Sequence, residues 1–184
     1  MSIFYNVFFV KTEHSMESLK SVFSRIDVMA ESPWIVCDYG DNDPDGLFEP
    51  GYYFTKEISA QFGEVIFICI DTRNDQFDYE HSQNGNILRK LSWISDGSVS
   101  VWEWVEGEME AWENEIIFSE NNLVRTLDSF YDQDEAAQRE DELRSIWQNK
   151  EYVLGDKFPL GDATIGMAVQ DYFGIVLPDK IRKR

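Results

Sequence analysis

Residues 64–105 carry the pattern that most restricts how this chain can fold. Short runs rich in β-branched and aromatic residues follow one another here, which is typical of strands. These runs are GEVIFICI (63–70), FDYEH (77–81), NILRKLSWI (86–94) and SVSVWEWVEG (98–107). Asn84-Gly85 separates the second run from the third and suits a tight hairpin turn, and Asp96-Gly97 separates the third from the fourth. The pattern predicts an antiparallel meander over about 64–105.

Helical patterns flank the predicted meander on both sides. Ser15 can cap a helix that we expect within residues 15–30, where apolar residues recur at helical spacing. The C-terminal third also reads as helical, with two N-cap residues, a charged helix and a stop signal: Ser119, Asp162, residues 133–150 and Gly174. Helices before and after a run of strands are typical of an α+β domain.

The length of 184 residues suits one domain of ordinary size. We therefore predict a single α+β domain over residues 1–179, with a central, mainly antiparallel sheet and helices packed on at least one face. Residues 180–184, KIRKR, form a separate basic tail. No internal repeat and no low-complexity linker divides the chain.

The strand expected over 98–107 has apolar residues at both odd-numbered and even-numbered positions, and so on both of its faces. Alternation along an extended strand places Val99, Val101 and Val105 on one face. It places Trp102 and Trp104 on the opposite face. This pattern predicts a sheet that helices cover on one side, and whose other side is partly covered or used for binding.

Acidic residues dominate the charge of the chain. There are 35 Asp and Glu against 16 Lys and Arg, so the formal net charge is −19. Four of the basic residues lie in the tail, which leaves residues 1–179 with a net charge of −23. Such a body repels nucleic-acid phosphates and attracts cationic proteins. The alternative is that the negative charge serves solubility alone.

The sequence predicts a cytoplasmic protein. No apolar run approaches the roughly 20 residues that span a bilayer, so we expect no membrane association. The N-terminus lacks the basic lead-in and the small-residue cleavage site of a signal peptide. Cys37 and Cys69 both lie in strand-like apolar runs, and we expect reduced core residues rather than a disulfide.

The segment VWEWVEGEMEAWENE (101–115) combines three Trp and six Glu residues with no Lys or Arg. One interpretation is a covered sheet, in which Trp112 packs back as a latch and the carboxylates face water. The other is a partner-binding surface, because aromatic anchors inside a charged rim are typical of protein interfaces. Its residues would be Trp102, Trp104, Glu106, Glu108, Glu110 and Trp112.

An acidic turn at 41–49, DNDPDGLFE, resembles the beginning of a calcium-binding loop. Asp41, Asp43 and Asp45 occupy alternate positions, and Glu49 could be a further ligand. The twelfth position holds Tyr52 instead of the glutamate that binds calcium through both oxygens. We therefore predict no tight metal site here, and we expect no cofactor.

No motif identifies a catalytic residue. The chain lacks the signatures of a serine hydrolase, a phosphate-binding loop and a zinc protease. Two histidines are too few for a convincing zinc site, and we expect His81 to be a polar surface residue. Arg89 and Arg125 are expected to pair with nearby carboxylates rather than with a ligand. The enzyme alternative is a hydrolase or transferase that uses a carboxylate in a cleft near Glu103 or Glu113.

Part of the meander resembles a loose group of uncharacterised bacterial proteins. These proteins have an R-x-L-x-aromatic strand, a Trp-containing strand and a G-x-x-x-x-W-E ending. The matching residues are Arg89, Leu91, Trp93, Trp102, Gly107, Trp112 and Glu113. The resemblance covers roughly 64–118 and implies no known activity.

In general character, as an acidic single domain without catalytic motifs, the chain also resembles immunity proteins that neutralise toxins. The sequence therefore predicts an acidic cytoplasmic binding module that captures a basic protein, such as a toxin. A small enzyme is the first alternative. A purely structural or accessory protein is the second.

Overall fold

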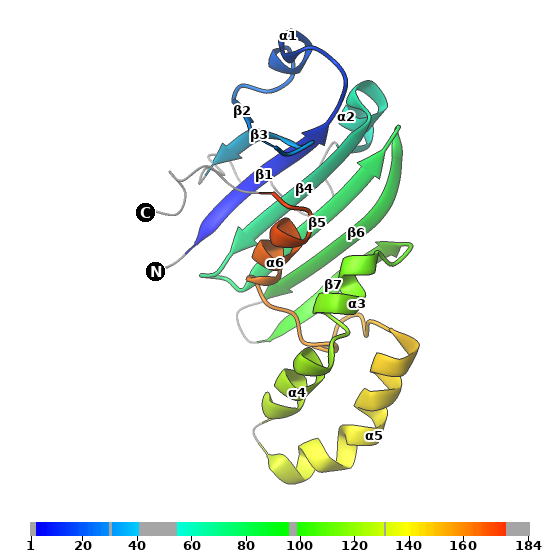
Figure 1. Ribbon diagram of the computed structural model, residues 1–184. Coiled ribbons are helices and arrows are strands. Elements are labelled where there is room, and N and C mark those ends of the chain that lie inside the picture. The colour runs from blue at the N-terminus through cyan, green and yellow to red at the C-terminus, as the bar shows by residue number, and fades with distance from the viewer. Residues whose placement is uncertain (1–2, 30, 41–54, 96–98, 131, 176–184) are drawn as a thin grey trace.

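The computed structural model describes residues 3–29, 31–40, 55–95, 99–130 and 132–175 (Figure 1). The predicted calcium-loop residues Asp41, Asp43, Asp45 and Glu49, the Asp96-Gly97 turn and the basic tail lie outside these residues. Within them, no helix has the length and apolar character needed to cross a membrane.

Among the residues described, seven strands form one antiparallel sheet in the order β2-β3-β1-β4-β5-β6-β7. The strands are β1 (Phe4–Lys11), β2 (Ile26–Val28), β3 (Ile35–Gly40), β4 (Glu64–Asp71), β5 (Gln76–Gln83), β6 (Asn86–Ser95) and β7 (Ser100–Gly107). The last four follow one another along the chain and are the predicted meander. Asn84 and Gly85 have φ angles of 50° and 81° and form the expected tight turn between β5 and β6.

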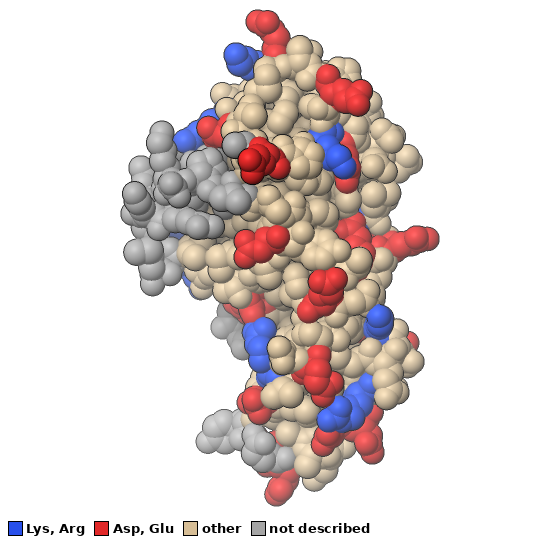
Figure 2. Space-filling view, in the orientation of Figure 1, with Lys and Arg blue, Asp and Glu red and all other residues tan. Residues whose placement is uncertain are grey.

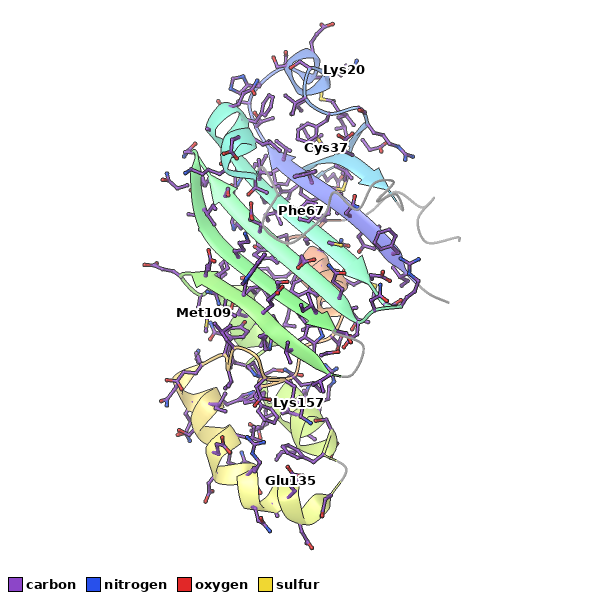
Figure 3. The ribbon with its side chains drawn as sticks, turned by 180° about the vertical axis from the view of Figure 1, so that it is seen from behind. Lys20, Cys37, Phe67, Met109, Glu135 and Lys157 are labelled. Carbon is purple, nitrogen blue, oxygen red and sulfur yellow. The ribbon has the colours of Figure 1, made fainter. Side chains whose placement is uncertain are left out.

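In the described part of the chain, six helices accompany this sheet, which confirms the α+β prediction. They are α1 (Met16–Lys20), α2 (Thr55–Phe62), α3 (Ala111–Ile116), α4 (Glu120–Asp128), α5 (Gln133–Asn149) and α6 (Ile165–Tyr172). In Figure 1, α3 and α6 lie over one face of the sheet, and α4 and α5 extend beyond the β7 edge. The opposite face is seen in Figure 3, with α2 across the upper ends of the strands.

The main core lies between the first face of the sheet and the C-terminal helices. Strand alternation supplies its large side chains, including Phe9 from β1, Ile68 from β4 and Trp93 from β6. A second cluster on the other face joins α1, α2, β1 and β4, and it includes Cys37. Cys37 and Cys69 are buried thiols that do not form a disulfide, as the sequence predicted.

The helix predicted within 15–30 is shorter than expected. Ser15 does cap it, because its side chain accepts a hydrogen bond from the Ser18 N–H. The helix ends at Lys20, and Ile26–Val28 is instead an edge strand paired with β3. This pairing satisfies backbone groups that a longer helix would otherwise have bonded, so tertiary contacts override the helical spacing.

A β-bulge corrects the predicted faces of β7. The register passes from Ser92↔Trp104 to Trp93↔Trp102, so two steps on β7 match one step on β6. The additional residue shifts the alternation between the two tryptophans. Trp102 therefore joins the main core with Trp93. Trp104 faces the opposite side of the sheet, where the Lys90 ammonium lies over its ring.

Candidate functional site

The acidic and aromatic segment 101–115 runs along β7, turns at Gly107 and enters α3 (Figure 1). Two of its three predicted aromatic anchors are core residues, because Trp102 and Trp112 are both 0% exposed. Trp104 is half-buried. The prediction of a Trp-lined binding surface is therefore wrong for Trp102 and Trp112.

Trp102 attaches the chain after α5 to the sheet. Its indole N–H donates a 2.6 Å hydrogen bond to the Pro159 carbonyl. Its ring packs edge-to-face against the rings of Trp93 and Tyr152, with ring centroids 5.2 Å and 4.8 Å away, respectively. These contacts give Trp102 a packing role that leaves no surface for a partner.

Glu110 was predicted to face water, but it accepts hydrogen bonds from three side chains. Its donors are the Tyr79 hydroxyl at 2.6 Å and the Trp112 indole at 2.8 Å. His81 Nδ1 lies 2.5 Å from its other oxygen. Glu110 thus joins the beginning of α3 to β5, which explains why Trp112 packs as a latch.

His81 is a buried residue between two carboxylates, not the surface residue that was predicted. Its Nε2 lies 3.1 Å from Glu64, which in turn pairs with Lys11 at 3.1 Å. Burial disfavours the charged ring, but the hydrogen bonds and charges of Glu110 and Glu64 outweigh it and raise the pKa of His81 to about 9. The imidazolium is therefore the form that connects β4, β5 and α3 at neutral pH. Alternation with Phe77 and Tyr79 on the same strand was the signal that could have indicated this burial.

Arg89 and Glu113 form a second buried connection. Arg89 Nε and NH2 donate to the two Glu113 oxygens at 2.9 and 2.7 Å. The remaining Arg89 nitrogen donates to the Gly107 carbonyl, and Tyr152 donates to Glu113 at 2.6 Å. The expected structural pairing of Arg89 is confirmed.

The structure also shows the surroundings of Arg125 and of Glu103 and Glu113, the two carboxylates considered for an enzyme. Arg125 pairs with Asp162, as expected. Glu113 is neutralised by Arg89 and completely buried, so it offers no reactive carboxylate. Glu103 is exposed on β7.

The carboxylates of Glu103, Glu106, Glu108 and Glu115 form what we call the acidic edge. All four residues are exposed along β7, the following loop and α3. None forms an ion pair within the described part of the chain. On α5, by contrast, Arg139 and Arg144 pair with neighbouring glutamates. Figure 2 shows further carboxylates spread along the length of the visible face.

A row of buried polar residues lies on the second face of the sheet. Ser92 donates to Asp78 at 2.6 Å, and the Thr55 and Ser82 hydroxyls are 2.8 Å apart. Burial raises the pKa of Glu80, which also accepts a hydrogen bond from Thr55. Sequence reasoning missed this row because alternating polar residues on β5 are equally typical of a solvated face.

A hollow of about 410 Å³ lies between α2, the segment after α1 and the sheet. Figure 3 shows α1 and α2 in its upper part. Apolar residues form most of its described lining, together with two carboxylates and an amide: Phe8, Val22, Phe23, Ile58, Asp38, Glu57 and Gln61. Burial raises the pKa of Asp38 although its carboxylate accepts a 2.7 Å hydrogen bond from the Arg25 backbone N–H. Sequence reasoning did not associate these residues, which come from β1, β3, α2 and the segment that follows α1.

Among the described residues, no group of three or more His, Cys, Asp or Glu side chains could hold a metal ion. Comparisons with protein-family models, curated proteins and solved structures found no match to this chain. The resemblance over 64–118 therefore stays a prediction.

Proposed function

We propose that this protein is a cytoplasmic binding module that captures a basic protein through its acidic edge. The observation that carries the proposal is a set of exposed carboxylates, Glu103, Glu106, Glu108 and Glu115, that form no ion pair with any residue the structure describes. The proposed surface retains Glu106 and Glu108 from the expected binding residues. Glu110 is replaced as a contact residue because His81, Tyr79 and Trp112 already occupy its oxygens.

Electrostatics would act mainly on the speed of capture. A net charge of −19 attracts a cationic protein over several ångströms, and like-charged partners are rejected. The two buried ion-pair networks hold β7 and α3 in one arrangement, so little conformational entropy is lost when a partner binds. A rigid acidic edge thus favours fast and selective association.

An immunity protein that neutralises a basic toxin is the specific form of this proposal. Such a protein needs rapid capture and no catalytic machinery, and both agree with the acidic edge and the absence of catalytic motifs in the sequence. Expression of the captured partner with and without this protein would test it. Growth arrest by the partner alone, relieved by this protein, is the expected result.

Capture from host lysate at low and high salt tests the binding proposal. The change is Glu103→Gln, Glu106→Gln and Glu108→Gln together, and the matched control removes three exposed carboxylates elsewhere with Glu135→Gln, Asp141→Asn and Glu151→Gln. We expect a cationic partner whose association slows about tenfold in the first variant and less in the control. Equal association of both variants, or a partner that binds independently of salt, would contradict the proposal.

A further inference from the structure

The hollow beside α1 and α2 combines an apolar wall with two carboxylates. Phe23 and Ile58 are buried in this wall, and Phe8 is half-buried. Asp38 and Glu57 line the same hollow. Neither carboxylate forms an ion pair with any Lys, Arg or His in the part of the chain that the structure describes.

We propose that this hollow binds a primary alkylammonium group, with its hydrocarbon stem against Phe8, Phe23 and Ile58 and its charged head at Asp38 and Glu57. The site is independent of the acidic edge and of the partner proposed above. A volume of about 410 Å³ exceeds what a four-carbon stem and its ammonium group need. The ligand can be a free amine or the side chain of a lysine in a peptide, since both present the same chemistry.

The chemistry of the hollow selects this ligand over its alternatives. An anion would meet two carboxylates, and a purely apolar molecule would leave Asp38 desolvated and without a countercharge. An ammonium head supplies that charge, while the stem removes apolar surface from water. Burial already disfavours the ionised form of Asp38, so a bound cation recovers free energy that the empty protein lacks.

Backbone contacts keep the Asp38 carboxylate in place. The backbone N–H groups of Ser24 and Arg25 donate to it. Asp38 also has a φ angle of 44°, so its position on β3 is set by the local backbone as well as by its hydrogen bonds. Asp38→Asn keeps an oxygen acceptor for these donors and removes the charge, which makes it a suitable test variant.

Titration of the full chain with n-butylammonium, followed by amide chemical shifts, tests the site. We expect shifts at Phe8, Phe23 and Ile58, a dissociation constant of about 1–10 mM, and binding at least about tenfold weaker for n-butanol, which has the same stem without the charge. Amine binding should also move the titration midpoint of the Asp38 carboxyl to lower pH. Equal binding of the alcohol, or shifts confined to the acidic edge, would overturn the proposal.

Variants separate this site from general attraction to a negative protein. Asp38→Asn and Glu57→Gln should each weaken n-butylammonium binding severalfold, whereas Glu135→Gln on α5 removes the same charge and should leave it unchanged. If all three variants bind equally, the hollow is not the site. Nα-acetyl-lysine methylamide identifies the source: binding comparable to the free amine indicates a peptide lysine, and much weaker binding indicates a small-molecule amine.

Discussion

Two buried cationic side chains hold segment 101–115 against the sheet. Arg89 binds Glu113 through two parallel hydrogen bonds, and His81 bridges Glu64 and Glu110. Each connection neutralises carboxylates inside a protein that has a large excess of them. Because desolvated charges are costly unless they are paired, removing one partner should cost more than removing both.

Arg89→Met tests the first connection. It leaves the completely buried Glu113 without its cation, so we expect the free energy of unfolding in urea to fall by about 3–5 kcal/mol. The double variant Arg89→Met, Glu113→Gln should lose less than the sum of the two single changes. Arg144→Met, which breaks only exposed ion pairs with Glu140 on α5 and Glu120 on α4, is the control and should have little effect. Additive losses would show that the two side chains are not coupled.

The pH dependence of stability tests the second connection. The pKa of His81 is about 9 in the folded protein against about 6.5 for an unfolded chain. Its contribution is therefore fully present below about pH 6.5 and is lost as the pH rises through about 9, by at most about 3 kcal/mol. Urea unfolding from pH 6 to 10 should show this loss in the natural protein and in a His14→Gln control. His81→Gln should abolish this pH-dependent loss of stability. An NMR titration of the His81 ring with a midpoint near pH 6.5 would contradict the prediction.

At the scale of elements, β7 and the turn that follows it decide which side chains are available. The bulge between Trp102 and Trp104 sends one indole into the core and leaves the other half-buried on the second face. Gly107 then has a φ angle of 84°, and a Cβ there would overlap the Leu88 carbonyl oxygen. The turn into α3 therefore depends on a residue without a side chain.

Gly107→Ala should destabilise the fold through both backbone strain and overlap. Gly155→Ala is the matched control, because Gly155 also has a positive φ, 74°, but a Cβ there meets nothing within 4 Å. We expect the control to cost about 1–2 kcal/mol, from backbone conformation alone. Thermal or urea unfolding should show a clearly larger loss for Gly107→Ala. Equal losses would mean that the Leu88 backbone moves aside without cost.

At the scale of the whole molecule, negative charge affects folding and association in opposite directions. A formal charge of −19 on 184 residues repels itself in the compact state and would attract the proposed basic partner from solution. Salt screens both effects, since the Debye length falls from about 30 Å at 0.01 M to about 10 Å at 0.1 M. Changing the salt concentration should therefore reveal both effects: self-repulsion in the folded protein and attraction of a basic partner.

Raising NaCl from 0.01 to 0.15 M should increase the midpoint of thermal unfolding and slow capture of a basic partner. Differential scanning calorimetry measures the first change and stopped-flow fluorescence the second. KCl should act like NaCl, because screening depends on ionic strength rather than on ion identity at these concentrations. A thermal midpoint that falls with salt would show that favourable ion pairs, and not self-repulsion, dominate the folded state.

The sequence by itself determined the α+β class, the meander and its Asn84-Gly85 turn. These depend on local preferences, namely β-branched runs and a pair of residues that accepts positive φ angles. The sequence also determined the net charge, which follows from composition. It determined the Ser15 and Ser119 helix caps, because each depends only on residues close to it in the chain. The pairing of Arg89 with a carboxylate could be expected because cations are scarce in this chain.

Only the tertiary structure decided which residues of segment 101–115 are exposed and which are buried. Strict alternation predicted that Trp102 and Trp104 share a face, but a bulge moves them apart, and nothing local in the sequence marks the bulge. The burial of Glu110 and His81 follows from contacts of the two neighbouring strands β4 and β5 with the beginning of α3, which comes two strands later in the chain. From sequence alone a charged side chain is expected to be exposed, because burying it is costly unless the fold places an opposite charge beside it. Glu110 and Glu113 have such a partner and are buried or half-buried, whereas the carboxylates of the acidic edge remain exposed.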